Sequence, residues 1–282
     1  MPGTLYVVAT PIGNLEDVTL RALRILREVS VIAAEDTRRT ARLLQHYSIS
    51  TRTTSLHEHN ERAKTATLIA RLTAGESIAL VSDAGTPVVS DPGGALVAAA
   101  HAAGIRVEPI PGPSAVVAAL SASGFGDQEF TFVGFPPNRS KARKAYFERL
   151  LAERRTIVFY EAPHRIRQCL EDMLAVFGDR QLVIARELTK RHENLVVRPI
   201  SGHLDSHLEE RGEFTLVLHG SSVSVETRAE PPGPSQISHE FWLMTNNDGL
   251  SRREALRRLA DRYKIPSREV YAILERGKKL VE

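Results

Sequence analysis

The sequence predicts an α/β protein with two lobes and a small C-terminal helical domain. From Leu5 to Gly112, short β-branched runs alternate with helical patterns, which is typical of βαβ units around a parallel sheet. From Phe130 onward the β-branched runs lie closer together and partly resemble hairpins, so a second lobe with a mixed sheet is expected. A Ser/Pro/Gly-rich segment, residues 221–235, then precedes a helical pattern and is predicted to be a linker.

The N-terminal lobe is expected to span residues 1–115. Its first strand ends at Pro11, and the helix that follows repeats Leu20, Leu23 and Leu26 on one face. The run from Ser77 to Asp83 is almost wholly apolar, as expected of a strand buried on both faces. The other expected elements of this lobe are a strand over Val29–Glu35, a helix over Thr40–Leu44, a short segment over 53–57, a helix over Glu61–Leu72 and a strand over 107–112.

The second lobe is expected to span residues 116–220, with the seam between the helix that starts at Ser114 and Phe130. It combines a basic helix from about Ser140 to Glu153 with a helix whose apolar positions include Leu170. The expected strands have the sequences TFVGF, TIVFYEA, LVIARELT, LVVRPI and FTLVLHG.

Residues 236–282 are expected to form three short helices. Ser251 and Glu254 have the spacing of a capping box, and Ser267 is a candidate N-cap after Pro266. Residues 251–282 carry 10 Lys and Arg against 5 Asp and Glu, although the whole chain has a net charge of only +3. A second basic cluster consists of Arg139, Lys141, Arg143 and Lys144. Such clusters mark either a polyanion contact or a solvated helix face.

The composition excludes several classes of protein. With 42% hydrophobic and 25% charged residues the chain is neither disordered nor fibrous. No apolar stretch reaches the ~20 residues of a membrane helix, and the first residues lack a signal-peptide pattern. A cytoplasmic location without a membrane partner is therefore expected. The single cysteine, Cys169, excludes an intramolecular disulfide and a cysteine metal site, and is expected to pack as a small apolar side chain on a helix.

Three loops at predicted strand ends are rich in glycine and other small residues. They span Ala9–Asn14, Ser82–Pro87 and Pro111–Ala115, at the sheet edge where α/β proteins bind ligands. Small residues let backbone N–H and C=O groups approach a ligand closely. A phosphate-binding G-x-x-x-x-G-K-[ST] loop and a strand-to-helix G-x-G-x-x-G turn are both missing, which disfavours an ATPase or a common dinucleotide oxidoreductase.

Seven motifs then match one family in order and spacing. They are ATPIGNLED, IAAEDTRRT, LHEHNE, LVSDAGTPVVSDPG, PIPGPSA, VFYEAPHR and ARELTK. The chain resembles the ribosomal small-subunit RNA cytidine 2′-O-methyltransferases of the tetrapyrrole methylase superfamily, densely over residues 4–220. The resemblance implies a two-lobed tetrapyrrole-methylase-like fold and a homodimer. It also implies S-adenosylmethionine-dependent methylation of the ribose of a cytidine in the decoding region of 16S rRNA, with either the naked RNA or the 30S subunit as the partner.

The resemblance also implies site residues. Those expected to bind S-adenosylmethionine are Pro11, Asp83, Ala84, Gly85, Thr86, Ser114, Ala115, Tyr160, Glu161 and Thr215. Where related porphyrin-precursor methylases read G-D-P, this chain reads Gly85-Thr86-Pro87, which favours an RNA substrate over a tetrapyrrole. Residues 236–282 would then be an RNA-binding domain, helped by the cluster around Lys141 through salt-sensitive attraction.

A ribose hydroxyl is a poor nucleophile while it is protonated, so a nearby proton acceptor is expected to help its attack on a methyl group. Asp36 and His57 are the candidates we favour, with Glu35, Glu58 and His59 as further ones. The alternative role of Glu35 and Asp36 is to cap the helix that starts at Thr37. The weak alternative for His57 and His59 is a metal site.

The residues expected to contact RNA are Arg38, Arg165 and Lys190, with Arg39 and His164 in the same motifs. Their alternative role is pairing with a carboxylate in the cleft. Two other functions also stay open: methylation of a tetrapyrrole precursor or a protein residue, and DNA binding by a helix-turn-helix over Leu250–Arg276 with ligand sensing by the α/β part.

Overall fold

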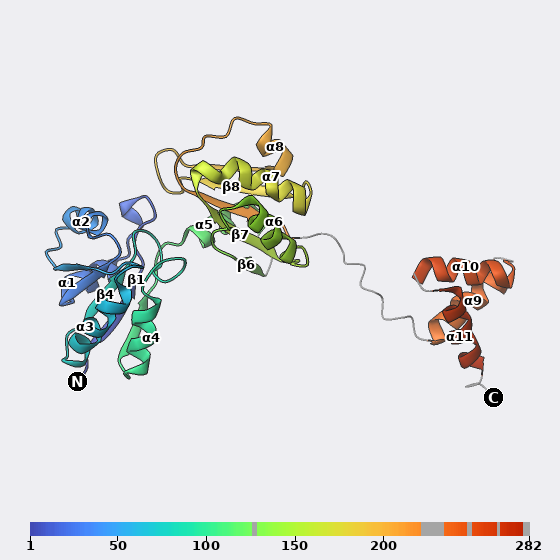
Figure 1. Cartoon of the computed structure of the whole chain (residues 1–282), viewed down its shortest axis with the longest axis horizontal. Helices are drawn as coiled ribbons and strands as arrows, with labels where there is room; N and C mark the ends of the chain where they lie inside the picture. Colours follow the sequence, from blue (N-terminus) through green and yellow to red (C-terminus); the bar gives the residue numbers. More distant parts are fainter. Residues whose placement is uncertain (126–128, 221–233, 247–249, 264–265, 279–282) are drawn as a thin grey trace. The chain divides into compact units, whose positions relative to one another are not determined.

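The computed structural model describes residues 1–125, 129–220, 234–246, 250–263 and 266–278. Most of the predicted linker, residues 221–233, lies outside the described residues. The chain divides into two compact units, Met1–Ser221 and Ser222–Glu282. Figure 1 draws both units, with labels on the α-helices and on some of the strands.

The first sheet is entirely parallel. Its strands are β1 (Thr4–Val8), β2 (Val31–Ala34), β3 (Thr53–Ser55), β4 (Ile78–Val81) and β5 (Arg106–Ile110), in the order β3-β2-β4-β1-β5. The parallel lobe predicted from the alternating pattern is confirmed. The short segment over 53–57 contributes β3, a three-residue strand at the edge of the sheet.

Helices cover both faces of this sheet. On one face, α1 (Leu20–Glu28) and α2 (Thr37–His46) pack through Leu26 and Leu43 against Ile32 and its neighbours. On the other face, α3 (Glu61–Thr73) and α4 (Gly94–Ala102) pack against the opposite side chains of the strands, such as Leu80. All four residues of β4 are buried, in agreement with the apolar run that predicted it.

The second sheet is mixed, as predicted. Its strands are β6 (Phe130–Phe132), β7 (Thr156–Glu161), β8 (Gln181–Arg186), β9 (Asn194–Pro199) and β10 (Phe214–Leu218). Their order is β6-β7-β10-β8-β9, and β6 and β7 are parallel while the other pairs are antiparallel.

One helix covers one face of the second sheet and three cover the other. Helix α5 (Ala115–Ser123) packs on residues such as Val158 and Val217. Helices α6 (Ser140–Arg149), α7 (Ile166–Phe177) and α8 (Ile200–Leu204) pack on the opposite face, around Phe159. Short 3₁₀ helices η1 (Leu15–Asp17) and η2 (Pro163–Arg165) complete the described part of this unit. Helix α5 thus packs with the second lobe. The seam expected between this helix and Phe130 and the boundary at residue 115 both stay predictions.

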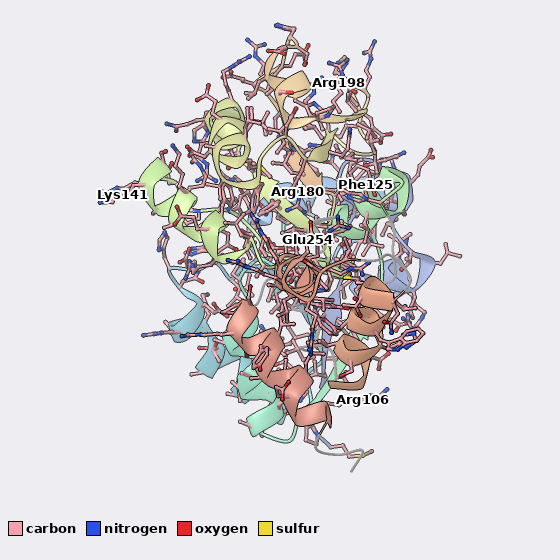
Figure 2. All side chains as sticks on the ribbon, turned by 90° about the vertical axis from the view of Figure 1, so that its right-hand side faces the viewer. Arg106, Phe125, Lys141, Arg180, Arg198 and Glu254 are labelled. Carbon is pink, nitrogen blue, oxygen red and sulfur yellow. The ribbon has the colours of Figure 1, made fainter. Side chains whose placement is uncertain are left out.

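The basic cluster on α6 corrects one expectation. Arg143 is fully buried, and its guanidinium pairs with Asp172 of α7 at 2.6 Å, so this side chain is not available to a polyanion. Lys144 also approaches Asp172, at 3.4 Å. Lys141 extends from α6 as an exposed side chain (Figure 2). Cys169 is buried on α7, which confirms its predicted apolar role.

The second unit contains three helices among its described residues: α9 (Pro234–Asn246), α10 (Arg252–Tyr263) and α11 (Ser267–Lys278). Ile237, Leu259 and Val270 form its core. The capping box is half formed. The Glu254 N–H donates to the Ser251 hydroxyl at 3.3 Å, which is one of its two hydrogen bonds. The Glu254 carboxylate, which in a complete box accepts from the backbone of the serine, here contacts the Ser251 hydroxyl. Among the described residues no helix is long and apolar enough to cross a membrane.

Candidate active site

The site begins where the parallel strands end. Because all five strands of the first sheet run in one direction, the loops after β1, β2, β4 and β5 meet at one edge. Two of these loops are joined by reciprocal backbone hydrogen bonds between Thr10 and Gly85, of 2.8 and 2.9 Å. Gly85 has a φ of +78°, a conformation that favours glycine, which explains why the turn carries no side chain there.

A cavity of about 370 Å³ lies at this edge and reaches the second lobe. Nine of the ten predicted cofactor residues line it: Asp83, Ala84, Gly85, Thr86, Ser114, Ala115, Tyr160, Glu161 and Thr215. Pro11 lines an adjoining cavity instead. The structure therefore brings together almost the whole set that the resemblance implied, from segments more than 100 residues apart in the sequence.

The second lobe contributes one wall through the antiparallel pair β7 and β10. Tyr160 and Thr215 are direct partners in that pair, so their side chains lie on the same face. Burial raises the pKa of Tyr160 to about 12, with a further rise from the charge of Asp91 and an opposing effect of a hydrogen bond from the Val116 backbone. Tyr160 is therefore uncharged at neutral pH and is a poor base.

The start of α5 contributes backbone donors. Ser114 is the N-cap, and its side chain makes no capping hydrogen bond. The first N–H groups of a helix have no partner within the helix, and the helix dipole adds partial positive charge there. This end of the cavity therefore suits a polar or anionic group.

Five carboxylates line the cavity, and they differ in their partners. Three pair with a cation: Asp83 with Arg39 at 3.3 Å, Glu161 with Arg165, and Glu213 with Lys190 at 3.1 Å. Glu35 and Asp91 form no ion pair with any residue that the structure describes.

The pKa values of the two unpaired carboxylates are raised. Burial raises the pKa of Asp91 to about 6, opposed by a hydrogen bond from Ser82 and reinforced by the charges of Glu35 and Asp83. Burial also raises the pKa of Glu35, although the Asp83 backbone N–H donates to it. Asp91 was not among the predicted site residues, although it lies within the motif LVSDAGTPVVSDPG; the fold shows that it lines the cavity.

Asp36 and Arg38 lie outside the cavity lining. Asp36 is the N-cap of α2, where it accepts from the Arg38 N–H at 2.8 Å, and this is the helix-capping alternative. The Arg38 side chain pairs with it at 2.7 Å while remaining 89% exposed. Hydrogen bonds from Arg38 hold the pKa of Asp36 well below its usual range, so this carboxylate is a weak base.

The predicted histidines lie away from the described cavities. The His57 Nε2 atom lies 3.0 Å from the side-chain amide nitrogen of Asn60, just before α3. Neither the His57 ring nor the His59 ring lines the cofactor cavity. The geometry therefore gives His57 and Glu58 no contact with the reacting groups expected here. Among the described residues no group of three or more His, Cys, Asp or Glu side chains could hold a metal ion.

Two of the predicted RNA-binding cations have carboxylate partners. Arg165 pairs with Glu161, with only 14% of the arginine side chain exposed. Lys190 pairs with Glu187 at 2.9 Å as well as with Glu213. For both side chains the structure shows the carboxylate alternative, while His164 is exposed on η2.

The two lobes touch near this site at Gly13. The Asn14 N–H donates to the Thr189 hydroxyl at 3.0 Å. A Cβ on Gly13 would lie 2.4 Å from Lys190 Cγ and 2.9 Å from the Leu188 backbone oxygen, so no side chain fits at this position without displacement.

Comparison with known proteins identifies the family. A family model described as tetrapyrrole (corrin/porphyrin) methylases matches residues 4–202. The chain belongs to the tetrapyrrole methylase family. Within this family it is 44% identical over 277 residues to ribosomal RNA small subunit methyltransferase I of Halalkalibacterium halodurans, covering 96% of this chain and 94% of that protein. The protein of the same name from Vibrio cholerae is 46% identical over 257 residues, or 89% and 88% of the two chains.

Solved structures of tetrapyrrole methylases agree on the fold. Uroporphyrin-III C-methyltransferase from Thermus thermophilus, complexed with S-adenyl homocysteine, has a TM-score of 0.55 at 16% identity, over 76% of this chain and 97% of that one. Such low identity shows the fold alone. The predicted two-lobed fold and the family resemblance are both confirmed.

Proposed function

We propose that this chain transfers a methyl group from S-adenosylmethionine to the ribose 2′-hydroxyl of a cytidine in the decoding region of 16S rRNA. The observation that carries the proposal is the cavity between the two lobes, where the small-residue loops of the first sheet meet Tyr160 and Thr215. The names of the 42–46% identical relatives that match nearly the whole chain, all of them ribosomal RNA small subunit methyltransferases, support the choice of RNA.

The residues present fit this cofactor. The cavity volume of about 370 Å³ lies within the range of roughly 300–1,000 Å³ typical of small-molecule sites. S-adenosylmethionine carries two cationic groups, and Glu35 and Asp91 are carboxylates without a cationic partner among the described residues. Its carboxylate and neutral parts suit the backbone groups of Gly85, Thr86 and Ala115. When bound, it supplies an electrophilic methyl group on a sulfonium.

The chain must also hold the hydroxyl in line and accept its proton. Positioning of the two reacting groups contributes a large part of the rate in such a displacement. Of the predicted proton acceptors, Glu35 lines the cavity, and its raised pKa makes it a stronger base than Asp36. We therefore assign the proton to Glu35 rather than to Asp36 or His57.

The basic helices of the second unit would add attraction for rRNA. Arg253, Arg257 and Arg268 are exposed on α10 and α11, where they could contact phosphates. The relative from Halalkalibacterium halodurans matches 96% of the chain, so this unit belongs to the same protein type and a separate DNA-binding function is disfavoured. The homodimer implied by the resemblance is part of the proposal and is checked by light scattering of the full chain.

One experiment tests the reaction directly. The full-length protein is mixed with labelled S-adenosylmethionine and with 30S subunits that lack the modification, naked 16S rRNA, a tetrapyrrole precursor or duplex DNA. Label is expected in a single cytidine ribose of the 16S rRNA, identified by mass spectrometry of nucleosides. Label in a base, in a protein or in the tetrapyrrole would contradict the proposal.

A further inference from the structure

A second cavity, of about 390 Å³, adjoins the cofactor cavity. Its lining comes from the loop after β1, from α2, from the loop after β4 and from the second-lobe residues Lys190 and Glu213. The two cavities share five lining residues: Ile12, Arg39, Asp83, Ala84 and Glu213. A molecule seated in the second cavity would therefore reach the first across this common wall.

The two cavities differ in charge. The cofactor cavity is lined by five carboxylates and by Arg39 as its only cation among the described residues. The second cavity is lined by Arg39, Arg42 and Lys190 against the carboxylates Asp83 and Glu213. A phosphate is repelled by the first set of charges and attracted by the second, whereas a sulfonium has the opposite preference.

Arg42 differs from the other two cations of the second cavity. Arg39 pairs with Asp83, and Lys190 pairs with two glutamates. Arg42 is exposed on α2 and forms no ion pair with any residue that the structure describes. A guanidinium presents several N–H donors in a planar fork that matches the oxygens of a phosphate.

We propose that the second cavity receives the target nucleotide of the RNA, with Arg42 binding its phosphodiester and the uncharged ribose reaching the shared wall at Asp83 and Ala84. This inference rests on the proposed function. It explains why the charges are separated: the phosphate stays in the basic cavity while only the hydroxyl enters the acidic one.

The test compares Arg42→Gln with Arg21→Gln in the full-length protein. Arg21 is a matched control, since it is an exposed arginine on α1 that lines neither cavity. For Arg42→Gln the KM for unmethylated 30S subunits is expected to rise about tenfold, as for loss of a charge-assisted contact of about 1.4 kcal/mol. The slope of log KM against log salt should fall by about 0.7 to 0.9, the share of one phosphate.

Affinity for S-adenosylmethionine, measured by calorimetry, is expected to stay at the wild-type value, which also verifies folding. Arg42→Lys should recover part of the KM. Equal KM values for Arg42→Gln and Arg21→Gln, or loss of cofactor affinity in Arg42→Gln, would overturn the inference alone. A wild-type chain that transfers no methyl group to 30S subunits or to naked 16S rRNA would instead overturn the proposed function and this inference with it.

Discussion

The backbone N–H of Asp83 donates a hydrogen bond of 3.2 Å to the Glu35 carboxylate. The Asp83 carboxylate in turn accepts from the N–H of Asp36 at 3.0 Å, so the ends of β4 and β2 are joined on both sides. This arrangement fixes Glu35 at the cavity wall. It also brings the two carboxylates close together, which adds to the rise in the pKa of Glu35 that burial causes.

Replacing Glu35 by Gln should therefore slow methyl transfer. The amide can still accept the Asp83 hydrogen bond, but it cannot take a proton, so kcat is expected to fall about 100-fold or more. The acidic limb of the pH–rate profile should disappear in this variant. Asp36→Asn is the matched control, because asparagine also caps helices and Asp36 lies outside the cavity. A Glu35→Gln enzyme with wild-type kcat would place the proton elsewhere.

Cofactor affinity should depend on pH through Asp91. Its pKa of about 6 means that the carboxyl is largely neutral at pH 5 and ionised at pH 7.5. A cationic ligand favours the ionised form, so affinity for S-adenosylmethionine should rise as the pH increases through 6. Calorimetric titrations between pH 5 and 7.5 measure this. Asp91→Asn should bind more weakly at pH 7.5 with a flatter pH dependence; an unchanged profile in that variant would exclude Asp91 as the cause.

A side chain at Gly85 should weaken cofactor binding more than it destabilises the fold. The residue has a φ of +78°, and an added Cβ would meet Ile12 Cγ2 at 3.4 Å, beside the cavity. Gly85→Ala is compared with Gly104→Ala, at a φ of +67° with no atom within 4 Å of the added Cβ. Both changes carry backbone strain of about 1–2 kcal/mol. Only Gly85→Ala is expected to raise the dissociation constant for S-adenosylmethionine; equal constants for the two variants would remove this loop from the site.

The buried pair of Arg143 and Asp172 is expected to stabilise the fold rather than to bind RNA. Arg143→Met leaves Asp172 buried without its main partner, which is expected to destabilise the fold by about 3–5 kcal/mol in urea unfolding. Lys141→Met, on the exposed face of the same helix, should change the free energy of unfolding by less than about 0.5 kcal/mol. The double change Arg143→Met and Asp172→Leu should recover stability. Equal unfolding free energies for Arg143→Met and Lys141→Met would show that the pair is not buried in solution.

Much of the fold could be predicted from the sequence because its signals are local. The apolar run that became β4 and the leucine spacing of α1 depend on neighbours along the chain. The short strand β3 has no such pattern, since its pairing with β2 comes from the sheet.

The site was predictable where it follows strand ends, as for Gly85 and Ser114. It was not predictable where the burial or the pKa of a side chain depends on residues far away in the sequence. Arg143 reads as one of four surface cations, and only Asp172, 29 positions further on, explains its burial. Asp91 was not predicted as a site residue, and its raised pKa arises from burial and then from the charges of Glu35 and Asp83, which lie elsewhere in the sequence.

The contact at Gly13 sets the spacing of the two lobes. With no side chain at this position, the loop after β1 rests directly on the Leu188–Lys190 segment, and a Cβ would come within 2.9 Å of a backbone oxygen there. A larger residue at this position would push the loop after β1 away from that segment and would tilt one sheet away from the other. The close approach of the two lobes at this contact therefore depends on the absence of a side chain at position 13.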